Sequence, residues 1–248
     1  MKILAIIPAR MGSSRFPGKP MAKILNKPMI GHVYDAVSRC KSLTMTAVAT
    51  CDNEIYEYIH SLDGEAVMTL DTYERASDRC AEALLKIEKE RNLKFDIVVM
   101  IQGDEPMTHP DMIDEAIKPM IQDQSIKVVN LVSNISTQEE FYDRNCIKVV
   151  TDLNDNALYF SREPIPTSHN MDGQVQCKKQ VCIIPFRRDY LIEYTNLAPT
   201  NLEIQESVDM LRVLEHGDNV KMVPTKHKTH AVDTRDDLIK VEKIMKSL

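Results

Sequence analysis

The fold is decided by residues 1–20, which read MKILAIIPARMGSSRFPGKP. The first seven, Met1–Ile7, form an apolar run that predicts a buried strand. Two glycines and three prolines follow within residues 8–20 and exclude an immediate helix, so a loop must leave the carboxyl end of this strand. Open α/β sheets bind their ligands at such strand ends. We therefore expect a ligand-binding loop directly after the first strand.

Cations concentrate in this loop, at Arg10, Arg15 and Lys19. Gly12 lets the backbone come close to a ligand, while Ser13 and Ser14 offer hydroxyl and amide donors. Together these groups suit a polyphosphate. The pattern matches neither G-x-x-x-x-G-K-[ST] nor G-x-G-x-x-G. Taken alone, the cluster is equally open to interpretation as a solvated basic loop.

Length and composition indicate one globular domain. The 248 residues, 43% of them hydrophobic, are enough for one sizeable core, so we expect a single domain spanning 1–248. A net charge of −6 argues against binding to nucleic acid or to an anionic membrane. No apolar run is long enough for a signal peptide or a membrane span. We expect a cytoplasmic protein without membrane insertion, whose six scattered cysteines are free thiols.

Strands and helices alternate over the first hundred residues, which predicts a mainly parallel α/β sheet. The predicted strands are Met1–Ile7, Met45–Thr50, Glu65–Thr69 and Phe95–Ile101, and the predicted helices are Pro28–Lys41, Asn53–His60 and Ser77–Arg91.

The second half is richer in strand candidates. Strands are predicted at Lys127–Ser133, Cys146–Thr151, Ala157–Ser161, Gln174–Phe186 and Val220–Val223, and helices at Pro110–Gln122, Glu203–His216 and Arg235–Leu248. The turn Asn154–Asn156 predicts a hairpin between the second and third of these strands. Residues of approximately 130–190 are therefore expected to form a small β-rich lobe.

Two aspartates lie at the boundaries of predicted elements. Asp104 follows the most apolar strand candidate, and Asp233 precedes the last predicted helix, where capping that helix is the simpler interpretation. If the basic loop holds a triphosphate, a carboxylate about 4 Å from a phosphate oxygen costs on the order of 4 kcal/mol. Acids beside such a ligand therefore imply a bridging cation, and oxygen ligands shared with phosphate are the usual arrangement for Mg²⁺.

Several blocks of the sequence closely resemble the 3-deoxy-manno-octulosonate cytidylyltransferases, or CMP-Kdo synthetases, and more distantly the CMP-sialic acid synthetases. The blocks are IPARMGSSRFPGKP at 7–20, KPMI at 27–30, QGDEPM at 102–107, ALYFSR at 157–162 and VDT at 232–234. They cover essentially the whole chain in the family's order.

The resemblance implies a Rossmann-like nucleotide-diphospho-sugar transferase sheet with a small β-rich dimerisation lobe, and a homodimer. The implied reaction transfers CMP from CTP to a 2-keto-3-deoxy sugar acid, Kdo or a close relative, and releases pyrophosphate. That reaction belongs to lipopolysaccharide biosynthesis.

Residue roles also follow from the resemblance. The nucleotide would be bound by Pro8, Ala9, Arg10, Ser13, Ser14, Arg15, Lys19, Ser77, Arg79 and Gln102. The acceptor would be bound by Gln102, Arg162, Gln180, Glu206 and Asp209. Lys19, Asp104 and Arg15 would be catalytic, and Asp104 and Asp233 would coordinate Mg²⁺.

The chain departs from the family at the sugar-acid site. Residues 180–184 read QVCII where family members commonly read HLGIY, and Met210 stands where an amide is expected. Losing polar partners in a site for a polyhydroxylated ligand usually accompanies a changed ligand. Kdo retained and a different acidic acceptor, such as a phosphonate or another acid sugar, therefore both stay open. Further cations that an acid could meet are Lys178, Lys179, Arg187 and Arg188.

A nucleotide-binding module without turnover is a third possibility. Loss of Lys19, Asp104 or Asp233 would be its expected sign, and all three are present.

Overall fold

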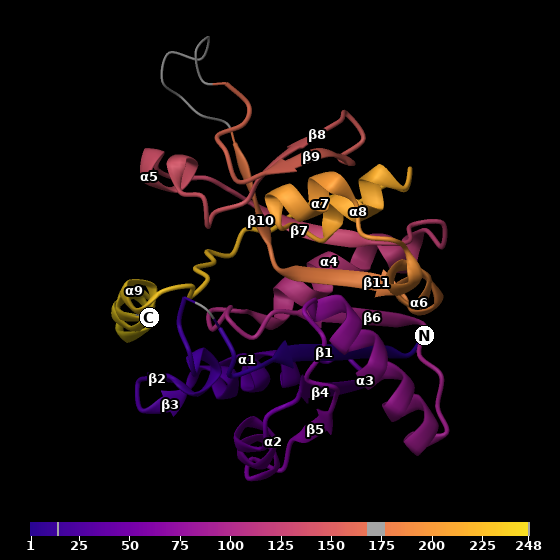
Figure 1. Cartoon of the computed structure of the whole chain (residues 1–248), viewed down its shortest axis with the longest axis vertical. Helices are drawn as coiled ribbons and strands as arrows, with labels where there is room; N and C mark the ends of the chain where they lie inside the picture. Colours follow the sequence, from indigo (N-terminus) through magenta and orange to yellow (C-terminus); the bar gives the residue numbers. More distant parts are fainter. Residues whose placement is uncertain (14, 168–176, 248) are drawn as a thin grey trace.

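A central five-stranded sheet runs through the computed structural model, which describes residues 1–13, 15–167 and 177–247 (Figure 1). Its strands lie in the order β11-β6-β1-β4-β5. Their bounds are β1 Ile3–Ala9, β4 Met45–Thr50, β5 Glu65–Met68, β6 Ile97–Ile101 and β11 Ile183–Arg187. The first four in chain order are parallel and β11 pairs antiparallel with β6. The predicted mainly parallel α/β sheet is confirmed.

Helices cover both faces of this sheet because alternate residues of β1 point to opposite sides. Ile3, Ala5 and Ile7 pack with apolar side chains of α1, α2 and α4, whereas Leu4 and Ile6 pack with those of α3 and α6. The bounds are α1 Met29–Ser38, α2 Asn53–His60, α3 Ala76–Arg91, α4 Pro110–Gln122 and α6 Arg188–Asn196. None of the helices in the described ranges is both long and apolar enough to cross a bilayer.

A second five-stranded sheet has the order β12-β7-β10-β8-β9. Its strands are β7 Val129–Asn134, β8 Lys148–Thr151, β9 Ala157–Ser161, β10 Lys178–Val181 and β12 Lys221–Pro224. The predicted hairpin is confirmed, since β8 and β9 pair antiparallel. A bridge between Val128 and Phe186 joins the two sheets beside β11.

Two predicted elements prove to be broken. The run Gln174–Phe186, of which residues 174–176 lie outside the described part, contains β10 and β11 in different sheets. The helix predicted at Glu203–His216 is two helices, α7 Asn201–Glu206 and α8 Met210–Glu215. The break comes at Ser207, whose φ of 52° is left-handed. Neither glycine nor proline marks this break, so apolar spacing alone predicts one helix.

Short elements escaped prediction because each spans too few residues to show a period. They are a 3₁₀ turn at Lys19–Met21, the ribbon β2 Lys23–Ile24 with β3 Lys27–Pro28, and α5 Gln138–Tyr142. The last helix, α9 Arg235–Lys246, begins where the sequence predicts and ends before Leu248, which lies outside the described residues.

The parallel register brings three strand ends to one edge of the central sheet. Ala9 pairs with Thr50, and Ile6 pairs with Met100 near the end of β6. The loops that follow β1, β4 and β6 therefore lie next to one another, and the first and third carry the cations and the acid that the sequence singles out.

Candidate active site

The basic loop of residues 10–20 is closed on itself and fastened to its neighbour. The Gly18 backbone N–H donates to the Met11 carbonyl at 3.0 Å, with Gly18 in the left-handed region at φ 73°. Met11 N–H donates to Asp52 Oδ2 at 2.8 Å, in the loop after β4. Glycine is needed at position 18 because residues with a side chain rarely adopt a positive φ. These contacts fasten the described parts of the loop at Met11 and Gly18.

Lys19 lies between the two aspartates that the sequence singles out. Its Nζ is 2.7 Å from Asp104 Oδ2 and 3.5 Å from Asp233 Oδ1. Arg15 contacts the same Asp233 oxygen at 2.9 Å. A backbone hydrogen bond of 2.9 Å from Val232 N–H to the Asp104 carbonyl joins the two acidic segments directly. The structure thus brings Asp104 and Asp233 together around one ammonium group.

Burial and mutual repulsion shape the charges of this cluster. Burial, followed by the nearby Asp104 carboxylate, raises the pKa of Asp233. The same two causes raise the pKa of Glu105 to about 8. Burial alone would lower the pKa of Lys19, but its attraction to Asp104 and Asp233 outweighs burial, so this pKa is raised. The carboxyl groups of Asp104, Glu105 and Asp233 form an oxygen donor set that fits a hard divalent cation. Lys19 and Arg15 balance their charge in the structure, and a phosphate could attract these two cations away.

Two cavities meet at this cluster. The first, here called the loop cavity, has a volume of about 450 Å³ and lies between the basic loop and the start of α3. The second, the sheet cavity, has a volume of about 280 Å³ and lies against β10 and the 229–233 segment. The residues that line both are Arg15, Lys19, Gln102, Asp104, Ser207 and Asp209. A ligand in one cavity can therefore reach a ligand in the other across Lys19 and Asp104.

Most residues of the predicted nucleotide set line the loop cavity. They are Pro8, Ala9, Arg10, Ser13, Arg15, Lys19, Arg79 and Gln102. Ser77 is fully buried and does not line it in the described structure; its hydroxyl lies 3.5 Å from Asp209 Oδ2. Ser14 lies outside the described residues.

Arg79 has a guanidinium group that is only partly paired. One terminal nitrogen donates to Thr69 Oγ1 and, at 3.2 Å, to the Leu70 carbonyl. The other terminal nitrogen is buried and finds no partner in the described part of the chain. A buried N–H without an acceptor is costly. It therefore indicates a ligand acceptor, such as the carbonyl oxygen of a base, at the wall of the loop cavity.

The predicted acceptor residues divide into two groups. Gln102, Gln180, Arg162 and Asp209 line the sheet cavity, and Glu206 does not line it in the described structure. Burial raises the pKa of Asp209, and Arg75 pairs with it at 2.8 Å. Gln180 donates its side-chain amide to Asn130 Oδ1 at 2.6 Å.

The polar side-chain atoms of Arg162 and Glu206 make hydrogen bonds within the protein. The Arg162 guanidinium donates to the backbone carbonyls of Arg144, Glu206 and Ser207. The Glu206 carboxylate accepts from the Tyr159 and Ser161 hydroxyls and from Arg162 N–H. Both side chains thus support the cavity wall.

Two cations outside the predicted set belong to the cavities. Arg75 lines the loop cavity and contacts Asp209 and, at 3.5 Å, Glu203. Lys179, 14% exposed, lines the sheet cavity and pairs with Glu140 at 2.7 Å. Lys179 stood out as a cation in the sequence, but β-strand periodicity alone does not tell which of two adjacent lysines faces a cavity.

The other three cations lie elsewhere. Lys178 approaches Asp155 at 3.7 Å, Arg188 pairs with Glu88 at 2.6 Å, and Arg187 donates to the Met120 and Asp123 carbonyls. None of these three lines the loop cavity or the sheet cavity in the described structure.

The fold and the site define a class. A mainly parallel sheet with a cationic loop and paired aspartates between two confluent polar cavities is the arrangement of a nucleotidyltransferase, which must bind a charged nucleotide beside an acceptor. Residues 4–226 match the family model described as Cytidylyltransferase. Proteins named 3-deoxy-manno-octulosonate cytidylyltransferase from Geobacter metallireducens and Trichlorobacter lovleyi are each 41% identical, over 97% and 99% of this chain and 96% and 99% of their own.

The chain belongs to the 3-deoxy-manno-octulosonate cytidylyltransferase family and is a CTP-dependent nucleotidyltransferase. A solved structure described as CMP:2-keto-3-deoxy-manno-octonic acid synthetase complexed with CTP superimposes with a TM-score of 0.90 at 35% identity, covering 100% of this chain and 99% of that one. Cytidylyltransferases of this kind generally use a divalent metal ion.

Proposed function

We propose that this chain transfers CMP from CTP to 3-deoxy-manno-octulosonate or a close 2-keto-3-deoxy sugar acid, with release of pyrophosphate. The observation that carries the proposal is the junction of the two cavities at Lys19 and Asp104. There a nucleotide in the loop cavity would meet an acceptor in the sheet cavity. The names of the most similar relatives support the choice of acceptor.

In this proposal the loop cavity binds CTP. Arg10, Ser13, Ser14, Arg15 and Lys19 hold the triphosphate by charge and hydrogen bonds. The unpaired nitrogen of Arg79 accommodates a carbonyl oxygen of the base. Pro8, Ala9 and Gln102 complete the wall, and Ser77 acts behind it by supporting Asp209.

Catalysis would come from positioning and from neutralising charge. The acceptor hydroxyl oxygen forms a bond to the α-phosphorus while the bond to the pyrophosphate oxygen breaks, and negative charge grows on the leaving group. The hydroxyl proton would pass to Asp104 or to a water molecule. Lys19 and Arg15, which balance the aspartates in the structure, would turn to the phosphates. Asp104 and Asp233 would hold Mg²⁺, which, when bound, offsets phosphate charge and repulsion between these acids.

The acceptor's carboxylate and hydroxyls would lie in the sheet cavity. Lys179 and Arg15 offer positive charge, and Gln102, Gln180 and Asp209 offer hydrogen-bonding groups. Arg162 and Glu206 would act as positioning residues, since their polar atoms hold the wall together.

Pyrophosphate release tests the proposal. We expect release with CTP, Mg²⁺ and Kdo, and far less with ATP, GTP or UTP. The panel of acceptors should include Kdo, an amino-substituted Kdo, a sialic acid and a small phosphonate. Release only with an acid other than Kdo would reject the acceptor, and no release with any acceptor would favour a nucleotide-binding module.

Metal dependence is a separate test. Treatment with EDTA followed by desalting should abolish turnover, and added Mg²⁺ should restore it. Unchanged turnover in the chelated enzyme would reject a metal role for Asp104 and Asp233.

We also propose that residues 1–248 act as one nucleotidyltransferase domain whose 130–190 region forms a dimerisation lobe. Leu153 and Leu158 on the β8–β9 hairpin are strongly exposed, and β9 is an edge strand. Such exposed apolar groups at a sheet edge favour a covering partner. Light scattering should give twice the monomer mass, and a Leu153→Glu, Leu158→Glu variant should give the monomer mass.

A cytoplasmic location belongs to the same proposal. All six cysteines are free thiols, as expected for a protein in a reducing compartment. Cell fractionation with an antibody to the chain tests this location.

A further inference from the structure

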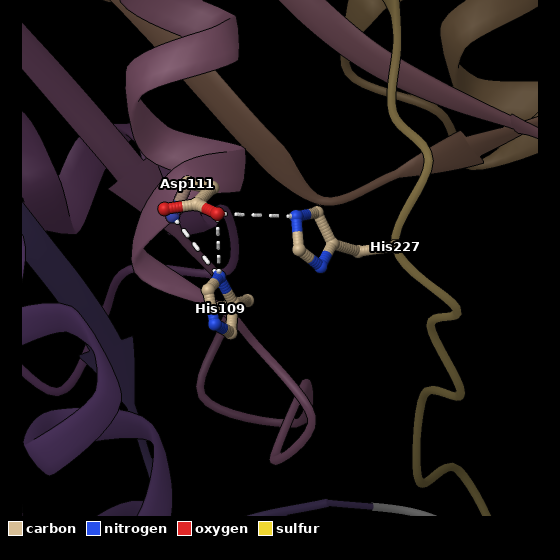
Figure 2. A group of neighbouring side chains, drawn as sticks. All are labelled: His109, Asp111 and His227. Carbon is tan, nitrogen blue, oxygen red and sulfur yellow. Dashed lines mark hydrogen bonds and ion pairs between the residues drawn. The ribbon is translucent and has the colours of Figure 1, made fainter.

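Away from both cavities, three side chains with metal-binding atoms gather at the surface. His109 and Asp111 lie at the start of α4, and His227 lies in the segment after β12 (Figure 2). Their candidate ligand atoms all lie within 4.8 Å of one another. The group therefore joins two segments that are distant in the sequence.

The distances within the group suit a coordinated metal. Asp111 Oδ2 lies 3.5 Å from His109 Nδ1 and 3.7 Å from His227 Nε2. Ligand atoms bound tetrahedrally at about 2.0–2.2 Å from zinc lie roughly 3.3–3.6 Å from each other. The carboxylate oxygen faces both rings, as Figure 2 shows. Small side-chain adjustments would bring all three atoms to bonding distance of one ion.

His109 has the tautomer that metal binding requires. Its Nδ1 accepts the backbone N–H of Asp111 at 3.2 Å, so this nitrogen carries a lone pair and no proton. The same nitrogen lies 3.5 Å from Asp111 Oδ2, so a cation placed between them would contact two ligand atoms. A bound metal would replace the N–H contact.

We propose that His109, Asp111 and His227 bind Zn²⁺ or a similar divalent transition metal. Two imidazoles and one carboxylate suit Zn²⁺, whereas Mg²⁺ prefers oxygen ligands alone. The side chains are 50%, 66% and 30% exposed, so water can complete the coordination. The imidazole rings lie nearly parallel, at 13°, with centroids 4.4 Å apart. Metal binding would turn one ring so that His109 Nδ1 and His227 Nε2 both point at the ion. Because the His109 side chain is half exposed, its ring has room to turn.

The site has a structural consequence for the paired aspartates. The chain reaches His109 one short loop after Asp104, and it reaches Asp233 shortly after His227. The hydrogen bond between Val232 and Asp104 already links these segments. A metal held by His109, Asp111 and His227 would be a second link between the same two segments and would slow their separation.

Calorimetric titration with Zn²⁺ tests the site. The full chain carries Asp104→Asn and Asp233→Asn in every sample, which removes the paired aspartates as ligands. We expect one Zn²⁺ per chain. Adding His227→Ala should weaken binding by at least about tenfold, because losing even a hydrogen-bond partner of a metal ligand costs about 10- to 100-fold. His109→Asn, which keeps a capping side chain for α4, should weaken binding similarly.

The matched control is His60→Ala, an exposed histidine on α2. It should leave Zn²⁺ affinity unchanged. Hydrogen exchange should slow in residues 225–233 when Zn²⁺ is added to the aspartate-free chain, and not when His227→Ala is also present. No Zn²⁺ binding to the aspartate-free chain, or equal affinity with and without His227, would overturn the proposal.

Discussion

Lys19 contacts both paired aspartates, so its ammonium group balances the charge of two acids. Its ammonium is balanced by Asp104 and Asp233 at the junction of the two cavities. A triphosphate would compete for that ammonium, and the acids would then need another cation. The exchange of partners explains why cations and acids occur together here.

Replacing Asp104 by Asn tests this arrangement. The amide keeps the shape of the side chain but cannot hold a divalent cation as strongly, so kcat should fall by at least about 10²-fold. Steady-state pyrophosphate release gives kcat, and thermal unfolding shows whether the fold persists. Asp71→Asn, an exposed aspartate outside both cavities, is the control and should be near normal. Normal turnover in Asp104→Asn would contradict the metal-ligand role.

Lys148 gives a prediction about stability. It is fully buried and donates to the carbonyls of Asp143, Cys146 and Arg162 at 2.6–2.7 Å. Methionine is apolar and therefore suits a buried position, but Lys148→Met leaves these carbonyl acceptors unpaired. The substitution should therefore lower the free energy of unfolding by roughly 3 kcal/mol. Urea denaturation measures the change.

Lys178→Met is the matched control for that experiment. Lys178 lies on β10, is 34% exposed, and contacts Asp155 at 3.7 Å and the Thr151 hydroxyl at 3.3 Å. Its loss should change stability by less than about 1 kcal/mol. Equal effects of the two substitutions would show that the three carbonyls do not depend on Lys148.

Some roles at this scale follow from sequence and others do not. Arg10 and Arg15 can be assigned from sequence because they belong to one continuous motif, IPARMGSSRFPGKP. Arg162 and Glu206 cannot, because their partners lie on other elements and no local pattern shows that carbonyls and hydroxyls already occupy them.

Helices and strands with a clear apolar pattern were predicted well, whereas the breaks between adjacent elements were not. The strands of the central sheet are nearly continuous apolar runs, which are typical of strands buried on both faces. The separation of α7 from α8 depends instead on the left-handed Ser207 and on buried pairing of Arg212 with Glu203 at 2.7 Å. These are tertiary effects that override helical periodicity.

Ser207→Gly tests the break between these helices. Glycine adopts a positive φ without the cost of about 1–2 kcal/mol that other residues meet in the left-handed region. Its greater freedom when unfolded offsets part of this gain, so we expect stability to rise by about 0.5 kcal/mol. Ser207→Val should be destabilised. Chemical denaturation of both variants gives the comparison, and a fall in stability for glycine would contradict the argument.

Across the whole molecule the cysteines should be poorly reactive. Burial is the main cause that raises the pKa of Cys40, Cys146 and Cys177 to about 11, and the thiolate is the reactive form. At pH 8 the native protein should react slowly with Ellman's reagent, and faster as the pH approaches 10. Unfolded protein should release six equivalents at once. Rapid labelling of any of these three thiols at pH 8 in native protein would contradict their raised pKa values.

The candidate site as a whole is assembled from segments spread over most of the chain. The resemblance to the family implies that Asp104 and Asp233 meet around one ion, and the structure shows how the parallel strand ends and the return of the 225–233 segment bring the two acids together. The two-cavity arrangement was not predictable, because cavities arise from how the two sheets join at β11.

Asp233 follows the last strand of both described sheets, and its segment docks on the loop after β6. A ribosome therefore completes every described strand before it adds the second acid of the pair. A nascent chain can therefore begin folding around these strands before it carries both aspartates of the pair.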